Sequence, residues 1–151
     1  MAIRFTLDTN ILVYAADSRE PARQLASIEI LARAARRDCA LVPQALAEFF
    51  HAATRKRIMT RPDAAREVLA WMTVFPLTPG PAAPALRTAL AEADSGRFQF
   101  FAALLVATAR DGGCKAVITE DMAAGALLDG VAIVGAFAGG GISERAMELL
   151  R

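Results

Sequence analysis

The stretch Ile3–Asn10, which reads IRFTLDTN, decides the fold class of this chain. Its apolar residues occupy every second position up to Leu7, which is the side-chain period of a β-strand. An acidic residue, Asp8, follows the strand directly. Because ligands of open parallel sheets bind beyond the carboxyl ends of the strands, Asp8 is the first candidate for a functional residue.

Segments with the patterns of helices and strands alternate along the rest of the chain. Apolar residues at helical spacing predict helices over Glu20–Arg37, Gln44–Arg57, Pro62–Phe75, Ala82–Ala93, Phe100–Arg110 and Ser143–Leu150. Continuous apolar runs predict strands covered on both faces over Cys39–Val42, Ala116–Thr119 and Val131–Val134. The alternation predicts an α/β fold, a three-layer sandwich with a central, mostly parallel sheet.

The length and composition suit a single domain. The chain has 151 residues, of which 55% are hydrophobic, and this is enough for a sizeable core. We expect the domain to cover residues 1–138, followed by a glycine-rich link and a short C-terminal helix over residues 139–151. No apolar run reaches the ~18 residues of a membrane span, and no signal-peptide pattern opens the chain, so we expect a cytoplasmic protein.

The two cysteines do not indicate a metal site or a disulfide. Cys39 and Cys114 lie far apart in the sequence and belong to no CxxC or Cys/His cluster. We therefore predict that both are buried free thiols.

The basic residues are unevenly distributed, although the net charge is only +1. A cluster that contains a single acid, Asp63, runs from Arg55 to Arg66. Its candidate RNA-binding members are Arg55, Lys56, Arg57 and Arg61. They predict a basic rim that contacts nucleic acid, and the alternative is an ordinary solvated helix end.

Three acidic residues are placed to meet at one edge of the sheet. Asp8 and Asp121 each come just after a predicted strand, and Glu48 lies on the second turn of a helix that follows another. Each also has an ordinary explanation. Asp8 could be only a helix N-cap, Glu48 a surface acid, and Asp121 with its neighbour Glu120 a polar turn.

A cluster of carboxylates needs either raised pKa values or a cation, because like charges repel at close range. Mg²⁺ or Mn²⁺ suits oxygen ligands and usually binds through a few carboxylates together with substrate phosphates. The chemistry that this combination predicts is phosphodiester hydrolysis.

The single histidine and the aromatic residues give weaker signals. His51 faces roughly the same side of its helix as Glu48, but a lone histidine is more often a polar surface or core residue than a catalyst. Trp71 and the phenylalanines are predicted to lie in the core rather than to stack against bases.

Three motifs together resemble a known family. The sequence LDTNILVY over Leu7–Tyr14 resembles the opening motif of PIN-domain ribonucleases of the VapC toxin type. The sequence AEFF over Ala47–Phe50 resembles the family's second acidic site. TEDM over Thr119–Met122, followed by Gly125 and by LDGV over Leu128–Val131, resembles its closing motif.

The resemblance implies a Mg²⁺- or Mn²⁺-dependent endoribonuclease that acts as the toxin of a toxin–antitoxin pair. Such proteins are usually dimeric and are inhibited by a small antitoxin. The resemblance also implies that the catalytic, metal-binding acids would be Asp8, Glu48 and Asp121. The supporting positions would be Asn10, Thr119 and Glu120.

One departure from the family pattern puts the activity in question. The helix before the closing motif usually begins with an aromatic pair followed by aspartate, whereas here Ala102 follows Phe100 and Phe101. An alanine at this position fits either natural loss of the acid or a deliberate inactivating substitution. Asp94 is too far along the chain to replace the acid without a different loop path, and Glu120 is the better substitute.

Two other functions remain open from the sequence. With its third acid missing, the chain could be a PIN-like module that binds RNA or an antitoxin without cutting. A phospho-accepting role for Asp8 is less favoured, because Asp8-Thr9-Asn10 lacks a second aspartate and no lysine follows a late strand.

Overall fold

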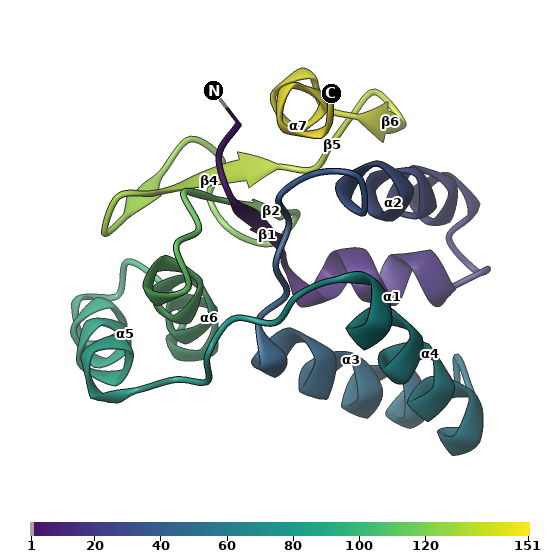
Figure 1. Ribbon diagram of the computed structural model, residues 1–151, viewed down its shortest axis with the longest axis horizontal. Helices are drawn as coiled ribbons and strands as arrows, with labels where there is room; N and C mark the ends of the chain where they lie inside the picture. Colours follow the sequence, from purple (N-terminus) through teal and green to yellow (C-terminus); the bar gives the residue numbers. More distant parts are fainter. Residues whose placement is uncertain (1) are drawn as a thin grey trace.

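A four-stranded sheet lies at the centre of the computed structural model, which describes residues 2–151; Met1, where the expected domain begins, lies outside them (Figure 1). The strand order is β1 (Phe5–Leu7), β2 (Ala116–Thr119), β4 (Val131–Gly135) and β3 (Leu127–Leu128). β1, β2 and β4 run parallel, and only the short edge strand β3 is antiparallel. The predicted α/β fold with a mostly parallel sheet is confirmed.

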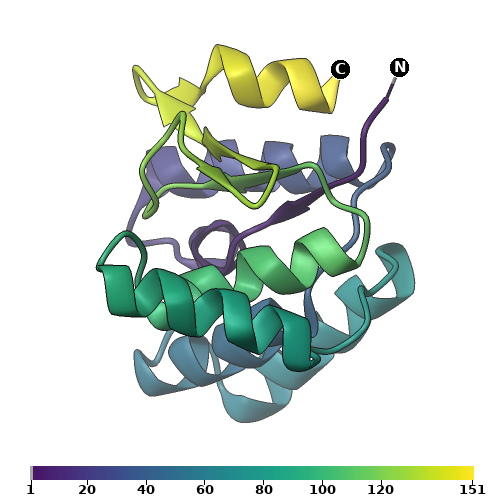
Figure 2. The same ribbon diagram turned by 90° about the vertical axis from the view of Figure 1, so that its left-hand side faces the viewer.

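Helices cover both faces of this sheet. They are α1 (Thr9–Ala16), α2 (Pro21–Ala34), α3 (Pro43–Arg55), α4 (Arg61–Val74), α5 (Ala83–Ser95), α6 (Phe100–Asp111) and α7 (Glu144–Leu150). Figure 2 shows α7 above the sheet and the pairs α5/α6 and α3/α4 below it, and Figure 1 shows α2 beside the sheet. β1 and β2 are buried along their whole length, as expected for strands covered on both sides.

Short strands over residues 127–128, 137–138 and 141–142 were not predicted, and two further segments differ from the prediction. Cys39–Val42 is buried but makes only isolated bridges, from Cys39 to Phe5 and from Leu41 to Leu77. Pro43 begins α3 directly afterwards and has no N–H to extend a ladder, so no regular strand forms there. The second difference is α1, a helix that starts immediately after Asp8 and buries Ile11 and Leu12.

Helix α6 is fixed in place at its C-terminal end. Its C-cap residue Gly112 lies so close to the buried Thr78 that a Cβ at this position would be 2.6 Å from the threonine Cγ2. Any side chain here would push the helix away from the segment that joins α4 to α5. The close contact therefore favours glycine at this position.

The C-terminal residues are packed onto the same domain. β5 (Phe137–Ala138) and β6 (Gly141–Ile142) form a hairpin, and α7 then packs against β4 and α2 with Ala146 and Leu150 buried. Within the described chain, no helix is both long and apolar enough to span a membrane. Cys39 and Cys114 are both buried and free, as predicted.

Candidate active site

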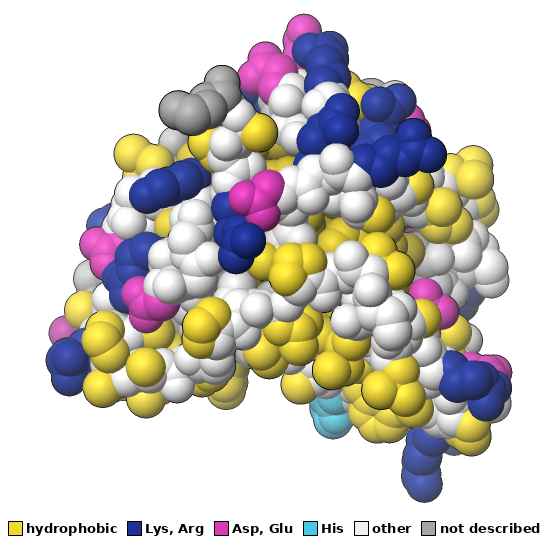
Figure 3. Space-filling model, in the orientation of Figure 1, with side chains coloured by type: hydrophobic (Ala, Val, Ile, Leu, Met, Phe, Trp, Pro, Cys, Tyr) yellow, Lys and Arg dark blue, Asp and Glu magenta, His cyan; other side chains and the backbone are white. Residues whose placement is uncertain are grey.

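A cleft of about 1400 Å³ opens beyond the carboxyl ends of β1 and β2. One wall comes from α3, and the other from the N-terminal end of α6 and the residues before it. Figure 3 shows the surface hollowed between these two parts of the molecule, with the histidine at the edge of the hollow. The lining includes all three predicted acids: Asp8, Glu48 and Asp121.

Asp8 is held firmly at the bottom of this cleft. Its Oδ1 accepts a 2.7 Å hydrogen bond from the Thr9 backbone N–H, so Asp8 is indeed the N-cap of α1. Its Oδ2 accepts a 2.7 Å hydrogen bond from the Thr119 hydroxyl and a 3.3 Å bond from the Asn10 amide. The capping role and a place in the acidic cleft therefore occur together.

The electrostatics of the cleft act on Asp8. Burial raises the pKa of the Asp8 carboxyl above its ordinary value, and the nearby carboxylates of Asp121 and Glu48 raise it further. Hydrogen bonds from Thr119 and Thr9 act in the opposite direction without reversing the shift. Asp121 and Glu48 are thus both close enough to Asp8 to affect its ionisation.

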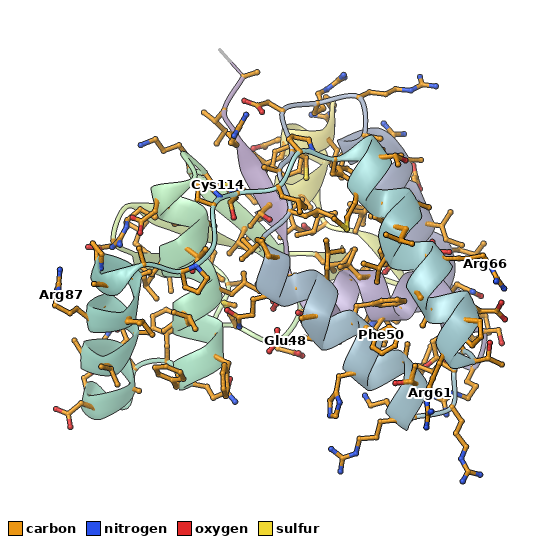
Figure 4. All side chains as sticks on the ribbon, turned by 60° about the horizontal axis from the view of Figure 1, so that its bottom comes forward. Glu48, Phe50, Arg61, Arg66, Arg87 and Cys114 are labelled. Atoms are coloured by element: carbon orange, nitrogen blue, oxygen red, sulfur yellow. The ribbon has the colours of Figure 1, made fainter. Side chains whose placement is uncertain are left out.

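Glu48 reaches the cleft from α3. Its carboxylate accepts a 2.8 Å hydrogen bond from the Thr9 hydroxyl, which ties the first turn of α1 to α3. Figure 4 shows the Glu48 side chain in the space between α3 and the green helices, α5 and α6. Ala47, His51 and Ala52 from the same helix face also line the cleft.

The loop that carries Asp121 is tied to Asp8 through two side chains. The Asp121 N–H donates to the Thr119 hydroxyl oxygen at 3.2 Å, and that hydroxyl itself donates to Asp8. The Glu120 N–H donates to the Asn10 carbonyl oxygen at 3.4 Å. Asn10 and Thr119 therefore link the strand ends that carry Asp8 and Asp121.

Glu120 lies away from the cleft. Its carboxylate accepts a 2.5 Å hydrogen bond from the Tyr14 hydroxyl and pairs with Arg23 at 2.7 Å. The Arg23 guanidinium in turn lies 4.6 Å from the centre of the Phe137 ring. Because Glu120 is committed to these partners and is not part of the cleft lining, this arrangement does not let it replace the missing acid.

Ala102 lines the cleft opposite Glu48. It is half-buried in the first turn of α6, a turn that contains no acidic residue. Asp94, near the end of α5, is exposed and lies outside the cleft lining. The position at which the sequence lacks an acid therefore does face the other acids, and neither of the two considered substitutes occupies its place.

The donor chemistry of the cleft fits a hard divalent cation, but the spacing is wide. The carboxylate oxygens of Asp8, Glu48 and Asp121 are ligands of the kind that Mg²⁺ and Mn²⁺ take, and the pKa of Asp8 is raised by burial first and by the two other carboxylates second. However, among residues 2–151 no three Asp, Glu, His or Cys side chains lie close enough together to hold an ion. The empty position at Ala102 is consistent with this incomplete set.

The predicted basic residues lie beside the cleft rather than in its floor. Of the four, only Lys56 lines the cleft, while Arg55 and Arg57 are exposed next to it at the end of α3. Arg61 begins α4 close to that end (Figure 4). These four side chains form no ion pair within residues 2–151, so their charges face solvent.

Sequence reasoning missed several residues of the cleft. Asp17 and Arg19, which pair with each other at 2.8 Å, line it just after α1, a helix that was not predicted. Arg19 lowers the pKa of the Asp17 carboxyl through their hydrogen bond. Phe101 also lines the cleft and is 54% exposed, although the phenylalanines were predicted to be core residues. No periodicity distinguishes Phe101 from its buried neighbours on α6.

Comparison with known proteins gives a family and a fold. The family model described as the PIN domain matches residues 5–124. The chain is also similar to a chain in the crystal structure of VapBC2 from Rickettsia felis bound to a DNA fragment from their promoter, with a TM-score of 0.62 and 14% identity. That match covers 88% of this chain and 98% of the other. A search of curated proteins finds no match.

Proposed function

The chain belongs to the PIN domain family, and we propose that it is a metal-dependent endoribonuclease that acts as the toxin of a toxin–antitoxin pair. The observation that carries the proposal is the convergence of Asp8, Glu48 and Asp121 in one cleft at the carboxyl ends of parallel strands. The resemblance of their motifs to VapC-type toxins supports the choice of RNA as substrate.

We assign the residues of the cleft two roles, metal binding and positioning. Asp8, Glu48 and Asp121 would contribute oxygen ligands to Mg²⁺ or Mn²⁺, and water and substrate phosphates would complete the ligand set. Asn10 and Thr119 would fix the position of Asp8 relative to the Asp121 loop through the hydrogen bonds that join them. When bound, the ion would neutralise charge on the scissile phosphate and make a water molecule a better nucleophile.

The residue at position 102 of the same cleft supports an enzyme with low activity. The methyl group of Ala102 supplies no oxygen ligand at a position that lines the site. With one carboxylate fewer, the attraction for a divalent ion falls, and we expect metal binding and cleavage to be poor. The substrate strand would lie along the exposed cations Arg55, Lys56, Arg57 and Arg61.

We further propose that the protein is cytoplasmic, is inhibited by a cognate antitoxin and forms a homodimer. The similar VapBC2 structure supports a protein partner, and exposed apolar side chains such as Leu69 and Leu90 support association. Light scattering at micromolar concentration should give twice the mass of the chain. A monomer would contradict the dimer and leave the nuclease proposal standing.

A second candidate function is a module that binds RNA or antitoxin without cutting. Ala102 is the observation that favours it. The deciding experiment incubates the full chain with RNA in excess Mn²⁺ and repeats the incubation with a chelator. Cleavage that needs Mn²⁺ supports the nuclease, whereas RNA binding without cleavage at any Mn²⁺ concentration supports the module.

A further inference from the structure

Three aromatic side chains line the cleft, Tyr14, Phe98 and Phe101, and of these Phe101 is the exposed one. The rings of Phe5 and Phe49 are almost fully buried, whereas Phe101 is 54% exposed and lines the acidic cleft. A large apolar side chain left open inside a polar cleft is more informative than one scattered on a convex surface. It offers a surface for a ligand with an apolar face.

The Phe101 ring stands on a fixed part of the scaffold. The Gln44 side-chain amide donates a 2.8 Å hydrogen bond to the Phe101 carbonyl and so ties the start of α6 to the start of α3. The adjacent Phe100 ring lies 5.1 Å from the Phe101 ring at an angle of 74°. These two interactions favour a position of the Phe101 ring at the cleft wall.

The opposite wall of the cleft carries groups that suit phosphates. His51 on α3 and Lys56, the C-cap residue of that helix, line it, and Lys56 forms no ion pair with any described residue. The exposed Arg55 and Arg57 continue the positive surface beyond the rim. An aromatic ring on one side and free cations on the other is the arrangement that binds single-stranded nucleic acid.

We propose that Phe101 stacks against an unpaired base of a single-stranded RNA whose phosphates face the basic end of α3. The inference rests on the proposed function, because both concern the same cleft. In a duplex the bases are already stacked on their neighbours, so an aromatic wall can take only a base that is splayed out. Phe101 would therefore make the cleft selective for unpaired segments.

The experiment measures binding separately from cleavage. The full chain is titrated in chelator with a short single-stranded RNA that carries the fluorescent base 2-aminopurine at one position at a time. Stacking should quench the fluorescence at one or a few positions. Phe101→Leu should remove the quenching and weaken binding about five-fold or more, whereas Phe101→Trp should keep both.

A matched control is available on α3. Phe50 is also exposed, at 36%, but lies outside the cleft lining, and Figure 4 shows it beside α4. Phe50→Leu should leave binding and quenching unchanged, and perfectly paired RNA should show no dependence on Phe101. Thermal unfolding should show that Phe101→Leu retains the wild-type midpoint.

Three results would overturn the proposal: no quenching at any position, equal quenching and affinity in Phe101→Leu, or the same loss in Phe50→Leu. Cleavage in Mn²⁺ is assayed independently. Quenching that depends on Phe101 without any cleavage would uphold the stacking site and reject the nuclease. Cleavage without such quenching would uphold the nuclease and reject the stacking site.

Discussion

The Tyr14 hydroxyl donates a 2.5 Å hydrogen bond to the Glu120 carboxylate, and this contact joins α1 to the loop that carries Asp121. The bond raises the pKa of Tyr14 above its ordinary value, since ionised tyrosine would lose the donor and face a carboxylate. Tyr14 is the only tyrosine in the chain, so its absorbance reports this contact without interference from another phenol.

We predict that an ultraviolet pH titration of the folded protein gives a tyrosine pKa above the ordinary value of about 10. Glu120→Gln should lower it, because the carboxylate is the first cause of the shift. Since the folded pKa is raised, the contribution of this group to stability is complete below the unfolded pKa and is lost as the pH rises through the folded one. An unchanged pKa in Glu120→Gln would contradict the contact.

Asp8→Asn should abolish Mn²⁺-dependent cleavage while the fold is retained. The amide nearly preserves the shape of the carboxylate but removes the charge that attracts the ion. Cleavage of RNA is the measurement, and circular dichroism checks the fold. Cleavage at the wild-type rate would place the reaction elsewhere.

Ala102→Asp should tighten Mn²⁺ binding at least ten-fold, which corresponds to about 1.4 kcal/mol. The new carboxylate would join the cleft from the first turn of α6. Without metal, the added repulsion should lower the unfolding midpoint near neutral pH. Calorimetry of Mn²⁺ binding tests the first effect and thermal unfolding the second.

Ala102→Asn is the matched control for that change, because it has nearly the same shape and no charge. It should show neither the gain in affinity nor the loss of metal-free stability. If Ala102→Asp and the present sequence bind Mn²⁺ equally, the position takes no part in the metal site.

Changing Arg55, Lys56 and Arg57 together to alanine should weaken RNA binding and flatten its dependence on salt. Each lost phosphate contact lowers the slope of log affinity against log salt by about 0.7 for a single strand. Arg87 on α5 is exposed and lies outside the cleft, so Arg87→Ala is the control (Figure 4). An unaltered slope in the triple variant would make the cluster an ordinary solvated helix end.

The cysteines of the folded protein should react very slowly with thiol reagents. Burial is the first cause of the raised pKa of both thiols, which for Cys114 reaches about 11. The stability that neutral thiols contribute should be lost as the pH rises from the unfolded value of about 8.5 toward the folded one. Labelling should become fast for both Cys39 and Cys114 in denaturant, and fast labelling of the native protein would contradict their burial.

The fold could be predicted where a local pattern determines the structure. The alternation up to Leu7 and the apolar run Ala116–Thr119 both form strands, because their side chains are covered on both faces. α1 was missed because Asp8-Thr9-Asn10 has turn chemistry and the β-branched residues after it have low helix propensity. Packing of Ile11 and Leu12 into the core overrides that propensity.

The site could be predicted only in part, because some of its features depend on residues that are distant in the sequence. Acids that follow strands meet at one edge by topology, so Asp8 and Asp121 are accessible to reasoning from sequence. The direction of Glu120 depends on Tyr14, which is 106 residues away, and on Arg23. The exposure of Phe101 depends on how α6 sits against α3. Neither the direction of Glu120 nor the exposure of Phe101 can be predicted from the residues next to it in the sequence.

The position of Ala102 has a consequence for how this protein can change. Its side chain is half-buried at the cleft wall, whereas α6 is held by other contacts: the hydrogen bond from Gln44 to the Phe101 carbonyl, the close approach at Gly112 and the buried face from Ala103 onward. Gain or loss of an acid at residue 102 therefore changes the charge of the cleft and leaves those packing contacts in place. Under the proposed function, substitution at this one site could weaken or restore metal binding without altering the basic residues at the end of α3.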